Sequence, residues 1–380
     1  MQTTLRLAKG LPIVAITGPR QSGKTTLARA AFPDLPYASL EDPDTREFAL
    51  ADPRGFLARF SEGAVLDEVQ RCPALFSYLQ GIVDEKPVMG RFVLTGSQQF
   101  GMLSSITQSL AGRVGLVQLL PFSLEELRDA GSLPETLDDL LWRGGYPPIH
   151  DRALDPGDWL ANYVATYLER DVRQLLAVKD LGLFQRFVKL CAARTGQILN
   201  LSALGADCGI AHVTAREWLG VLEASYLVTL LRPYHRNYGK RLIKSPKLYF
   251  LDTGLAAYLL GIRDPTSLGI HAQRGALFET LVVSELIKAR LNAGRTADIH
   301  FWRDSTGHEV DLLFEDDAGK LQAVEVKSGA TFAGDWVDAI RRWQRLAGEE
   351  TSTPWIVYGG EESYERQGIR TVSWRDLASL

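Results

Sequence analysis

Short apolar runs alternate with stretches of helical periodicity through the first third of the chain. Runs bounded by turn residues are typical of buried strands, and here they cover residues 12–17, 37–40, 64–69, 91–98 and 114–119. Segments between them, such as 25–32 and 73–83, place apolar residues at helical spacing. This alternation predicts an α/β fold in which helices cover both faces of a parallel sheet.

The segment after the first predicted strand reads G-x-x-x-x-G-K-T, and a helical pattern follows it. Its two glycines would let backbone N–H groups surround phosphates. Lys24 can reach the β- and γ-phosphates, and the Thr25 hydroxyl can bind Mg²⁺. The alternative is a glycine-rich turn without a ligand. We expect ATP and Mg²⁺ here, with the nucleotide contacted by Gly18, Pro19, Arg20, Gln21, Ser22, Gly23, Lys24, Thr25 and Thr26.

Two carboxylates, Asp67 and Glu68, follow the apolar part of the third predicted strand. Ligands of open α/β sheets bind beyond the carboxyl ends of the strands. Asp67 is therefore expected to hold Mg²⁺ and Glu68 to act as general base toward the attacking water. Alone, such a pair would mark only a strand entering a turn; after a phosphate-binding loop it predicts hydrolysis.

Polar residues and an arginine near the end of this region are candidates for sensing or stabilising phosphate charge. Ser97 or Gln98 is expected to lie near the γ-phosphate, unless the segment is an ordinary polar strand end. Arg113 could stabilise transition-state charge in its own chain or in a neighbouring subunit, or be a plain surface residue. Further arginines that could act between subunits are Arg143, Arg170 and Arg173, although surface ion pairs are the preferred interpretation of the last two.

The middle of the chain is predicted to be helical and then to form a winged helix-turn-helix. Helical patterns broken by Pro and Gly run from residue 121 to about 178 and suggest a lid packed on the ATPase core. A helix, a short helix, a glycine turn and a further helix follow, with two strands behind them. These elements are expected at 183–194, 202–207, 209–210, 212–224, 226–231 and 248–251.

A basic segment joins the two strands of this predicted module. Residues 232–247 contain no carboxylate, and Tyr234 and Tyr238 are interleaved with the basic side chains. Such a surface can bind nucleic-acid phosphates, and tyrosines can stack on exposed bases. The alternatives are a solvated loop and a protein-binding winged helix. The predicted DNA contacts are Arg216 on the preceding helix and Arg232, Arg236, Lys240, Arg241, Lys244 and Lys247.

The last third of the chain predicts the element order αβββαβ. Asp311 lies on the second of these strands and Glu325-Val326-Lys327 on the third, with Glu279 on the upstream helix. Glu325 and Lys327 share one face because they are two residues apart on a strand. Asp311 and Glu325 could hold Mg²⁺, and Lys327 could activate water. The pattern resembles the PD-(D/E)XK nuclease superfamily, although such domains can also serve as DNA-binding or structural units.

A wider resemblance covers nearly the whole chain. The phosphate-binding loop, VLDEVQ, LTGSQQ and SLAGR resemble a prokaryotic family of AAA+ ATPases that carry a C-terminal domain of unknown function. The likeness continues through GGYPP at 144–148, YLERDV at 167–172 and SPKLYFLDTGL at 245–255. AAA+ relatives commonly act as rings, so the resemblance implies a homo-oligomer, such as a hexamer-like ring.

Composition places few further limits on this protein. The 380 residues carry a net charge of −4 and are 46% hydrophobic, without a run long enough to span a membrane. The three cysteines favour a reducing cytoplasm, and the six histidines are not clustered. The expected domains are an AAA+ core over 1–135, a helical lid over 136–180, a winged helix over 181–265 and a nuclease-like domain over 266–380.

The favoured function is ATP-driven binding and remodelling of DNA, including branched or broken DNA. One alternative is an ATP-gated, Mg²⁺-dependent nuclease, in which cleavage is the output. The other is a regulatory ATPase whose C-terminal parts bind protein partners.

Overall fold

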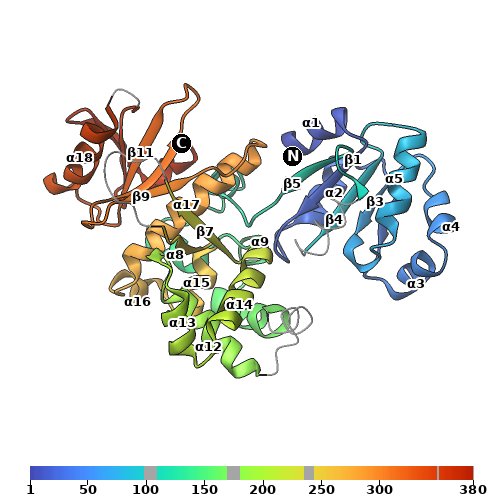
Figure 1. Cartoon of the computed structure of the whole chain (residues 1–380), viewed down its shortest axis with the longest axis horizontal. Helices are drawn as coiled ribbons and strands as arrows, with labels where there is room; N and C mark the ends of the chain where they lie inside the picture. Colours follow the sequence, from blue (N-terminus) through green and yellow to red (C-terminus); the bar gives the residue numbers. More distant parts are fainter. Residues whose placement is uncertain (98–108, 169–179, 235–243, 349–350, 380) are drawn as a thin grey trace. The chain divides into compact units, whose positions relative to one another are not determined.

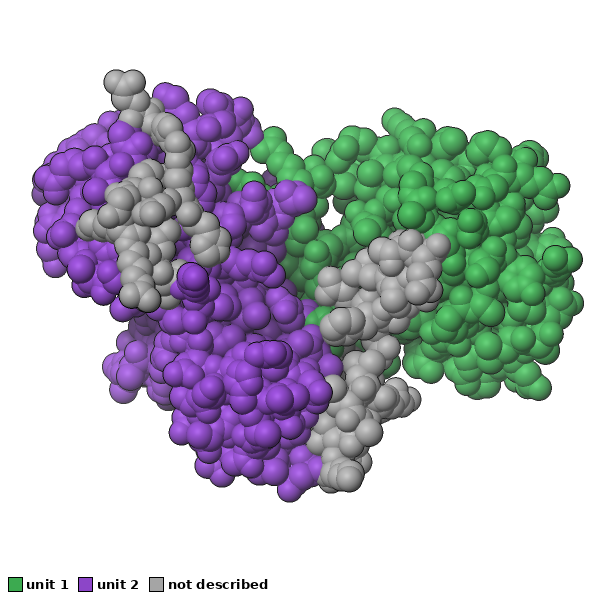
Figure 2. Space-filling model, in the orientation of Figure 1, with its two compact units in different colours: residues 1–121, 224–226, 290–295 green, residues 122–223, 227–289, 296–380 purple. Residues whose placement is uncertain are grey.

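The computed structural model describes residues 1–97, 109–168, 180–234, 244–348 and 351–379. Contacts divide the chain into two compact units, which Figure 2 colours separately. The first unit contains residues 1–121 with the short segments 224–226 and 290–295, and the second contains the remainder. In the described part of the chain, no helix is both long and apolar enough to cross a membrane.

The first unit is built on a five-stranded sheet in the order β2-β3-β4-β1-β5 (Figure 1). All four pairings are parallel, which confirms the predicted α/β arrangement. Ile13 at the start of β1 pairs with both Phe92 and Val114. The strands are β1 (Ile13–Thr17), β2 (Tyr37–Ser39), β3 (Ala64–Asp67), β4 (Phe92–Gly96) and β5 (Val114–Gln118).

Helices cover both faces of this sheet, and the central strand alternates between two cores. Ile13 and Ala15 belong to one hydrophobic cluster, whereas Val14 and Ile16 belong to the other. This pattern follows from the alternation of side chains along a strand. The helical elements are α1 (Gln2–Gly10), α2 (Lys24–Ala31), α3 (Pro43–Ala51), α4 (Pro53–Ala58), η1 (Val69–Arg71) and α5 (Leu75–Glu85).

One nine-stranded sheet runs through the second unit in the order β13-β14-β12-β11-β10-β9-β7-β8-β6. The parallel pairing of Arg232 in β7 with His300 in β9 joins the two predicted C-terminal modules into this sheet. The sequence did not reveal that junction. The strands are β6 (Gln197–Ile198), β7 (Val228–Pro233), β8 (Lys247–Phe250), β9 (His300–Arg303), β10 (Glu309–Glu315), β11 (Leu321–Lys327), β12 (Trp355–Tyr358), β13 (Tyr364–Arg366) and β14 (Ile369–Ser373).

Three helices precede β7 at the positions that the sequence indicates. Asn200 caps the middle helix by accepting a hydrogen bond from the N–H of Ala203. Gly209 ends it with a φ of +82°, a conformation that glycine adopts without strain. A Cβ at Gly205 would lie 2.9 Å from the carbonyl oxygen of Ile210, so the turn requires a small residue there. The helices are α12 (Leu181–Ala192), α13 (Leu201–Cys208) and α14 (His212–Ala224).

The helices between the sheet of the first unit and α12 differ in placement from the expected lid. Residues from 122 onward cluster with the second unit, where α8 packs on α15 and α16, and α10 on α15. The sequence signal was only helical periodicity, which does not specify the packing partner. These elements are α7 (Leu124–Asp129), α8 (Leu137–Arg143), α9 (Pro147–Asp151), α10 (Pro156–Tyr163), the π-helix η2 (Val164–Leu168), α15 (Thr253–Leu259) and α16 (Pro265–Gly269).

A buried aspartate joins two of the motifs noted in the sequence. Asp252 accepts hydrogen bonds from the N–H groups of Gly145 and Leu255, at 2.7 and 2.8 Å. Burial raises the pKa of Asp252, while those two bonds oppose the shift. A Cβ at Gly254 would lie 2.4 Å from the Arg143 carbonyl oxygen. The glycines of both motifs therefore allow two distant backbone segments to meet around one carboxylate.

The C-terminal elements follow the expected αβββαβ order and then continue. The hairpin of β13 and β14 extends the sheet beyond β12 and was not predicted. Ile340 and Trp343 of the second helix are fully buried against the sheet region. The helical elements are α17 (Arg274–Asn292), η3 (Gly334–Val337), α18 (Asp338–Ala347) and η5 (Trp374–Ser379).

We predict that Asp252→Ala lowers the free energy of unfolding by about 2–4 kcal/mol, because two buried N–H groups lose their acceptor. Asp264→Ala is the matched control, since Asp264 caps α16 by a solvent-exposed hydrogen bond from the N–H of Ser267. Urea unfolding followed by circular dichroism measures both. Equal effects of the two substitutions would contradict the structural role assigned to Asp252.

Candidate functional site

The phosphate-binding loop connects β1 to α2, as the sequence predicts. Gly18 has a φ of +152°, and a Cβ there would lie 1.9 Å from the carbonyl oxygen of Leu119. Gly23 has a φ of +92° and is the residue before α2. Both positions therefore require glycine for backbone reasons, and the loop carries its N–H groups to the N-terminus of α2, where a helix favours anions.

Lys24 is the cation at the centre of this loop. Its side chain is buried, and its Nζ donates a hydrogen bond to the carbonyl oxygen of Pro19 at 2.7 Å. Burial lowers the pKa of Lys24 to about 8, although the charges of Glu68 and Asp67 oppose this shift. A buried ammonium gains stability from nearby anions, so phosphate oxygens would complete its coordination.

Three hydroxyl groups surround Asp67 at the carboxyl end of β3. The Thr25 hydroxyl donates to Oδ1 at 2.9 Å, and the Tyr37 hydroxyl donates to Oδ2 at 2.8 Å. Thr95 in β4 also donates to Oδ1. Burial and the bond to Asp67 raise the pKa of Tyr37 to about 12. Tyr37 was not predicted, because only the parallel pairing of β2 with β3 brings it to Asp67.

The contact between Thr25 and Asp67 provides a test of the predicted Mg²⁺ site. Mg²⁺ prefers oxygen ligands and usually takes only one or two from the protein, with waters and phosphates supplying the others. A hydroxyl and a carboxylate oxygen 2.9 Å apart offer such a pair beside the phosphate-binding loop. These residues therefore fit Mg²⁺ together with a nucleotide.

Glu68 occupies a strained position directly after Asp67. It has a φ of +55°, in the left-handed region that residues other than glycine seldom adopt. Its Oε2 accepts hydrogen bonds from Gln70 at 2.6 Å and from Ser97 at 3.4 Å. Its backbone N–H donates to Thr95 at 3.4 Å. The strained backbone and these donors fix the direction of the carboxylate.

A hollow of about 250 Å³ brings these groups together. Glu41 also lines it and was not predicted, because it lies in the loop after β2 rather than in a recognised motif. The lining residues are Arg20, Gln21, Gly23, Lys24, Thr25, Thr26, Glu41, Asp67 and Glu68. One cavity thus contains most of the predicted loop and both carboxylates.

Ser97, a predicted sensor, lies beside Glu68, whereas the predicted arginine Arg113 lies at the opposite end of the strands. Ser97 is buried and contacts Glu68, whereas Gln98 lies outside the described residues. Arg113 precedes β5, and its carbonyl accepts from Ile13 at the start of β1. Its guanidinium pairs with Asp84.

This placement corrects the expectation that Arg113 could serve the nucleotide of its own chain. The phosphate-binding loop follows the opposite end of β1, a strand length of roughly 15 Å away. Arg143 forms an ion pair with Asp139 at 2.7 Å, and Arg170 and Arg173 lie outside the described residues.

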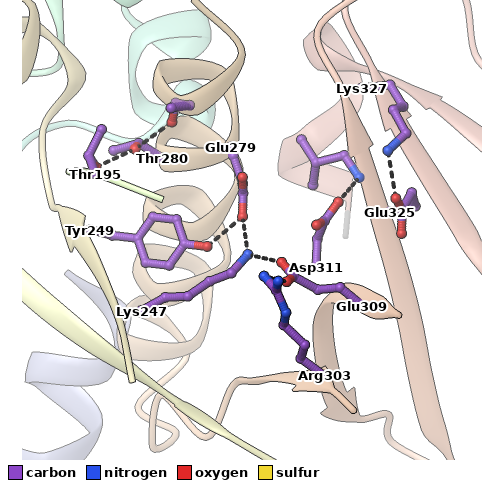
Figure 3. A network of polar contacts seen from close by, with 12 residues as sticks. Thr195, Lys247, Tyr249, Glu279, Thr280, Arg303, Glu309, Asp311, Glu325 and Lys327 are labelled. Atoms are coloured by element: carbon purple, nitrogen blue, oxygen red, sulfur yellow. Dashed lines mark hydrogen bonds and ion pairs between the residues drawn. The ribbon is translucent and has the colours of Figure 1, made fainter. Parts of the chain in front are cut away.

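The four predicted nuclease residues lie around a second site (Figure 3). Glu279 comes from α17, Asp311 from β10, and Glu325 and Lys327 from β11. β10 and β11 are antiparallel neighbours, which brings Asp311 next to Glu325. The N–H of Val326 donates to Asp311 at 2.8 Å, and Lys327 pairs with Glu325 at 2.6 Å.

The carboxylates of this centre perturb one another. Burial, and then the charge of Asp311, raises the pKa of Glu279 to about 7 and that of Glu325 to about 8. Glu325 is 6% exposed, and its Oε2 is buried without a hydrogen-bond partner. An unsatisfied buried carboxylate oxygen beside Asp311 fits a divalent cation held by those two residues. Among the residues that the structure describes, no group of three or more His, Cys, Asp or Glu forms a metal site.

Lys247 also enters this centre, which corrects its predicted role as a DNA contact. Its side chain is 3% exposed, and its Nζ pairs with Glu279 at 2.9 Å and with Glu309. Burial alone would lower the pKa of Lys247, but the charges of Glu279, Asp311 and Glu309 outweigh burial and raise it. A basic segment in the sequence does not reveal which of its residues faces inward.

The other predicted DNA contacts fall into two groups. Arg216, Arg232 and Lys244 are exposed, whereas Arg236, Lys240 and Arg241 lie outside the described residues. A hollow of about 650 Å³ lies beside α14, with Arg216 and His212 among its lining residues and Ser245 on the opposite segment. The first turns of α14 and Ser245, the residue after Lys244, are therefore open to solvent at this hollow.

Comparison with known families divides the chain into three consecutive matches. Residues 11–128 match a family described as an AAA domain. Residues 134–266 match a domain of unknown function (DUF8612), and residues 274–377 match another (DUF4143). The first match contains the phosphate-binding loop and both carboxylates, so the first unit contains a P-loop ATPase domain of the AAA class.

Similar proteins and structures were also found. The chain is similar to two solved structures, a Walker-type ATPase of Pyrococcus abyssi and the ORC2 protein of Aeropyrum pernix in its ADP form. The first has 13% identity and a TM-score of 0.46, with 68% of this chain and 93% of that chain covered. The second has 15% identity and a TM-score of 0.32, with 60% and 86% covered. Neither TM-score is high enough to establish a common fold.

Two mycobacterial sequences are much more similar. Uncharacterized proteins of Mycobacterium bovis and Mycobacterium tuberculosis are each 34% identical to this chain over 359 residues. Each alignment covers 93% of this chain and 78% of the relative. The chain belongs to the family of these mycobacterial proteins, and its residues 11–128 form an AAA-type P-loop ATPase domain.

Proposed function

We propose that this protein hydrolyses ATP with Mg²⁺ and couples hydrolysis to the binding and remodelling of DNA in a ring-like homo-oligomer. The observation that carries the ATPase part is the bond between Thr25 and Asp67, with Lys24 and Glu68 lining the same hollow. The DNA part is supported by the helix–turn–helix order of α13 and α14 with the exposed Arg216.

Each residue of the nucleotide site has a role that its position allows. Loop N–H groups and Lys24 would bind the phosphates, and Thr25 and Asp67 would hold Mg²⁺, which neutralises phosphate charge. Glu68 would take a proton from the attacking water through its carboxylate. Gln70 and Ser97 would keep that carboxylate oriented, because both donate to its Oε2.

An oligomer would supply further positive charge at the phosphates. Arg113 lies far from the nucleotide site of its own chain, and its side chain is 33% exposed in its pair with Asp84. An arginine of a neighbouring subunit can stabilise the charge of phosphoryl transfer. We therefore assign Arg113 to the nucleotide of an adjacent chain, with Arg143, Arg170 and Arg173 as the other candidates for that role.

DNA would bind along the exposed start of α14 and the described end of the basic segment, where Ser245 lines the same hollow as Arg216. Arg216 is exposed there, while Ala215, Trp218 and Leu219 bury the opposite side of the helix. Basic side chains contribute sequence-independent affinity through phosphates. Arg232 in β7 and Lys244, three residues before β8, add exposed charges from the described ends of this segment.

A second candidate is an Mg²⁺-dependent nuclease, and the convergence of Glu279, Asp311, Glu325 and Lys327 favours it. Asp311 and Glu325 would hold the metal, which polarises phosphate oxygens and bound water. Lys327 would contribute positive charge beside the phosphate. Such a centre could also support DNA binding without cleavage.

Substituting Glu68 by Gln should abolish turnover while leaving nucleotide binding intact. The amide cannot accept the proton of the attacking water, so we expect kcat to fall by about 100-fold or more. Steady-state phosphate release measures turnover, and fluorescent-nucleotide titration measures binding. Glu62→Gln, at an exposed position, is the control. A kcat of Glu68→Gln close to that of the wild type would remove Glu68 from this role.

The double variant Arg216→Glu/Lys244→Glu should bind duplex DNA about 10- to 100-fold more weakly and lower the slope of log affinity against log salt by about 2. Loss of two phosphate contacts is the physical reason. Fluorescence anisotropy at several salt concentrations measures both quantities. Arg263→Glu, which reverses one charge at another exposed arginine of the second unit, is the control for each single substitution. Equal weakening by the control would indicate a general effect of charge rather than contacts at α14.

For the nuclease candidate, we expect Mg²⁺-dependent cutting by the wild type to be lost in Asp311→Asn, because a metal ligand loses its charge. Single-stranded, duplex and four-way-junction DNA are incubated with protein, Mg²⁺ and ATP, and products are resolved on gels. Asp335→Asn, at an exposed position, is the control. If the wild type cuts none of these DNAs, the nuclease candidate is rejected.

A further inference from the structure

Lys247 reaches the carboxylate centre from a different part of the second unit. It begins β8, where its backbone pairs with Ile198 of β6 and Leu231 of β7. The other residues of the centre come from α17, β10 and β11. The continuous sheet of the second unit brings these elements together, and the Lys247 side chain is 97% buried at their junction.

The Lys247 ammonium engages one half of the centre. Its Nζ pairs with Oε1 of Glu279 and with Oε1 of Glu309. The second oxygen of Glu309 pairs with Arg303 at 2.8 Å, and the Tyr249 hydroxyl donates to Glu279 (Figure 3). Both carboxylates therefore already have positively charged or hydroxyl partners from the chain itself.

The other half of the centre retains an unsatisfied oxygen. Asp311 takes the Val326 N–H, and Glu325 takes Lys327 through Oε1 only. Glu325 Oε2 is buried without a partner, as described above. In one half of the centre, Lys247 neutralises the carboxylates. In the other half, Oε2 of Glu325 has neither a hydrogen-bond donor nor a cation.

When every group is counted in its ionised form, the formal charge in the centre is close to balance. The carboxylates are Glu279, Glu309, Asp311 and Glu325, and the cations are Lys247, Lys327 and Arg303. Carboxylates exceed cations by one charge while Lys247 is present. Removing the ammonium raises the excess to two, which equals the charge of a divalent ion. Unit charges a few ångströms apart interact strongly in a buried site.

We propose that Lys247 is a built-in cation of this centre and competes with divalent metal ions for its carboxylates. In the wild type, the ammonium takes Glu279 and Glu309, so only Asp311 and Glu325 are offered to a metal. Lys247 thereby weakens metal binding at this centre. This role concerns metal affinity and requires neither ATP hydrolysis nor DNA cleavage. A protein that lacks either activity can therefore still be tested for it.

The test is a Mn²⁺ titration of the full-length, nucleotide-free protein, with free Mn²⁺ measured by electron paramagnetic resonance. We expect Lys247→Met to bind Mn²⁺ at least about tenfold more tightly than the wild type, because a competing charge is removed. Adding Asp311→Asn to Lys247→Met should abolish that gain, which separates this centre from the nucleotide site. Lys189→Met, which removes an exposed lysine of α12, should leave the affinity unchanged.

A Mn²⁺ affinity of Lys247→Met within twofold of the wild type would overturn the proposal. A gain that persists after Asp311→Asn would do the same, since the extra metal would then bind elsewhere. Circular dichroism and thermal unfolding check the fold of each variant. Should Lys247→Met not fold, Lys247→Gln replaces it with the same expectation, because its amide can still donate to Glu279 without a charge.

Discussion

The hydrogen bond from Thr25 to Asp67 joins the two halves of the nucleotide site. Thr25 belongs to α2, the helix after the phosphate-binding loop. Asp67 ends β3, which lies two positions in the sheet from β1, the strand that leads into the loop. Parallel pairing places the carboxyl ends of β1, β3 and β4 at one edge, so the loop, both carboxylates and Ser97 meet there. The same geometry puts Arg113 at the other edge of the sheet, a strand length from the phosphate-binding loop of its own chain.

Buried carboxylates impose a comparable constraint on the second unit. A carboxylate removed from water needs donors or cations, and these come from distant parts of the chain. Asp252 obtains them from Gly145 and Leu255, and Glu279 obtains them from Tyr249 and Lys247. These contacts join the helices that follow the ATPase domain, the helix–turn–helix region and the C-terminal elements into one unit. The carboxylate centre and α14 therefore belong to one continuous framework.

The site residues that could be predicted from the sequence are defined by local chemistry. The phosphate-binding loop and the Asp67-Glu68 pair are defined by neighbouring residues and by the strand and helix beside them. The strand of Glu325 and Lys327 is also visible as a local pattern. Tyr37 and Lys247 could not be assigned in this way, because each reaches its carboxylate only through strand pairing. The joining of β7 to β9 is likewise a tertiary event that neither segment signals alone.

The most direct test of the central claim is the steady-state ATPase rate in Mg²⁺, measured without DNA and with single-stranded, duplex and four-way-junction DNA, beside Lys24→Ala. We expect at least one DNA form to raise the wild-type rate several-fold, and the variant to show neither basal nor stimulated turnover. A wild-type rate equal to that of the variant would contradict ATP hydrolysis at this site. A genuine rate that no DNA form changes would contradict DNA coupling and favour a regulatory ATPase with protein partners.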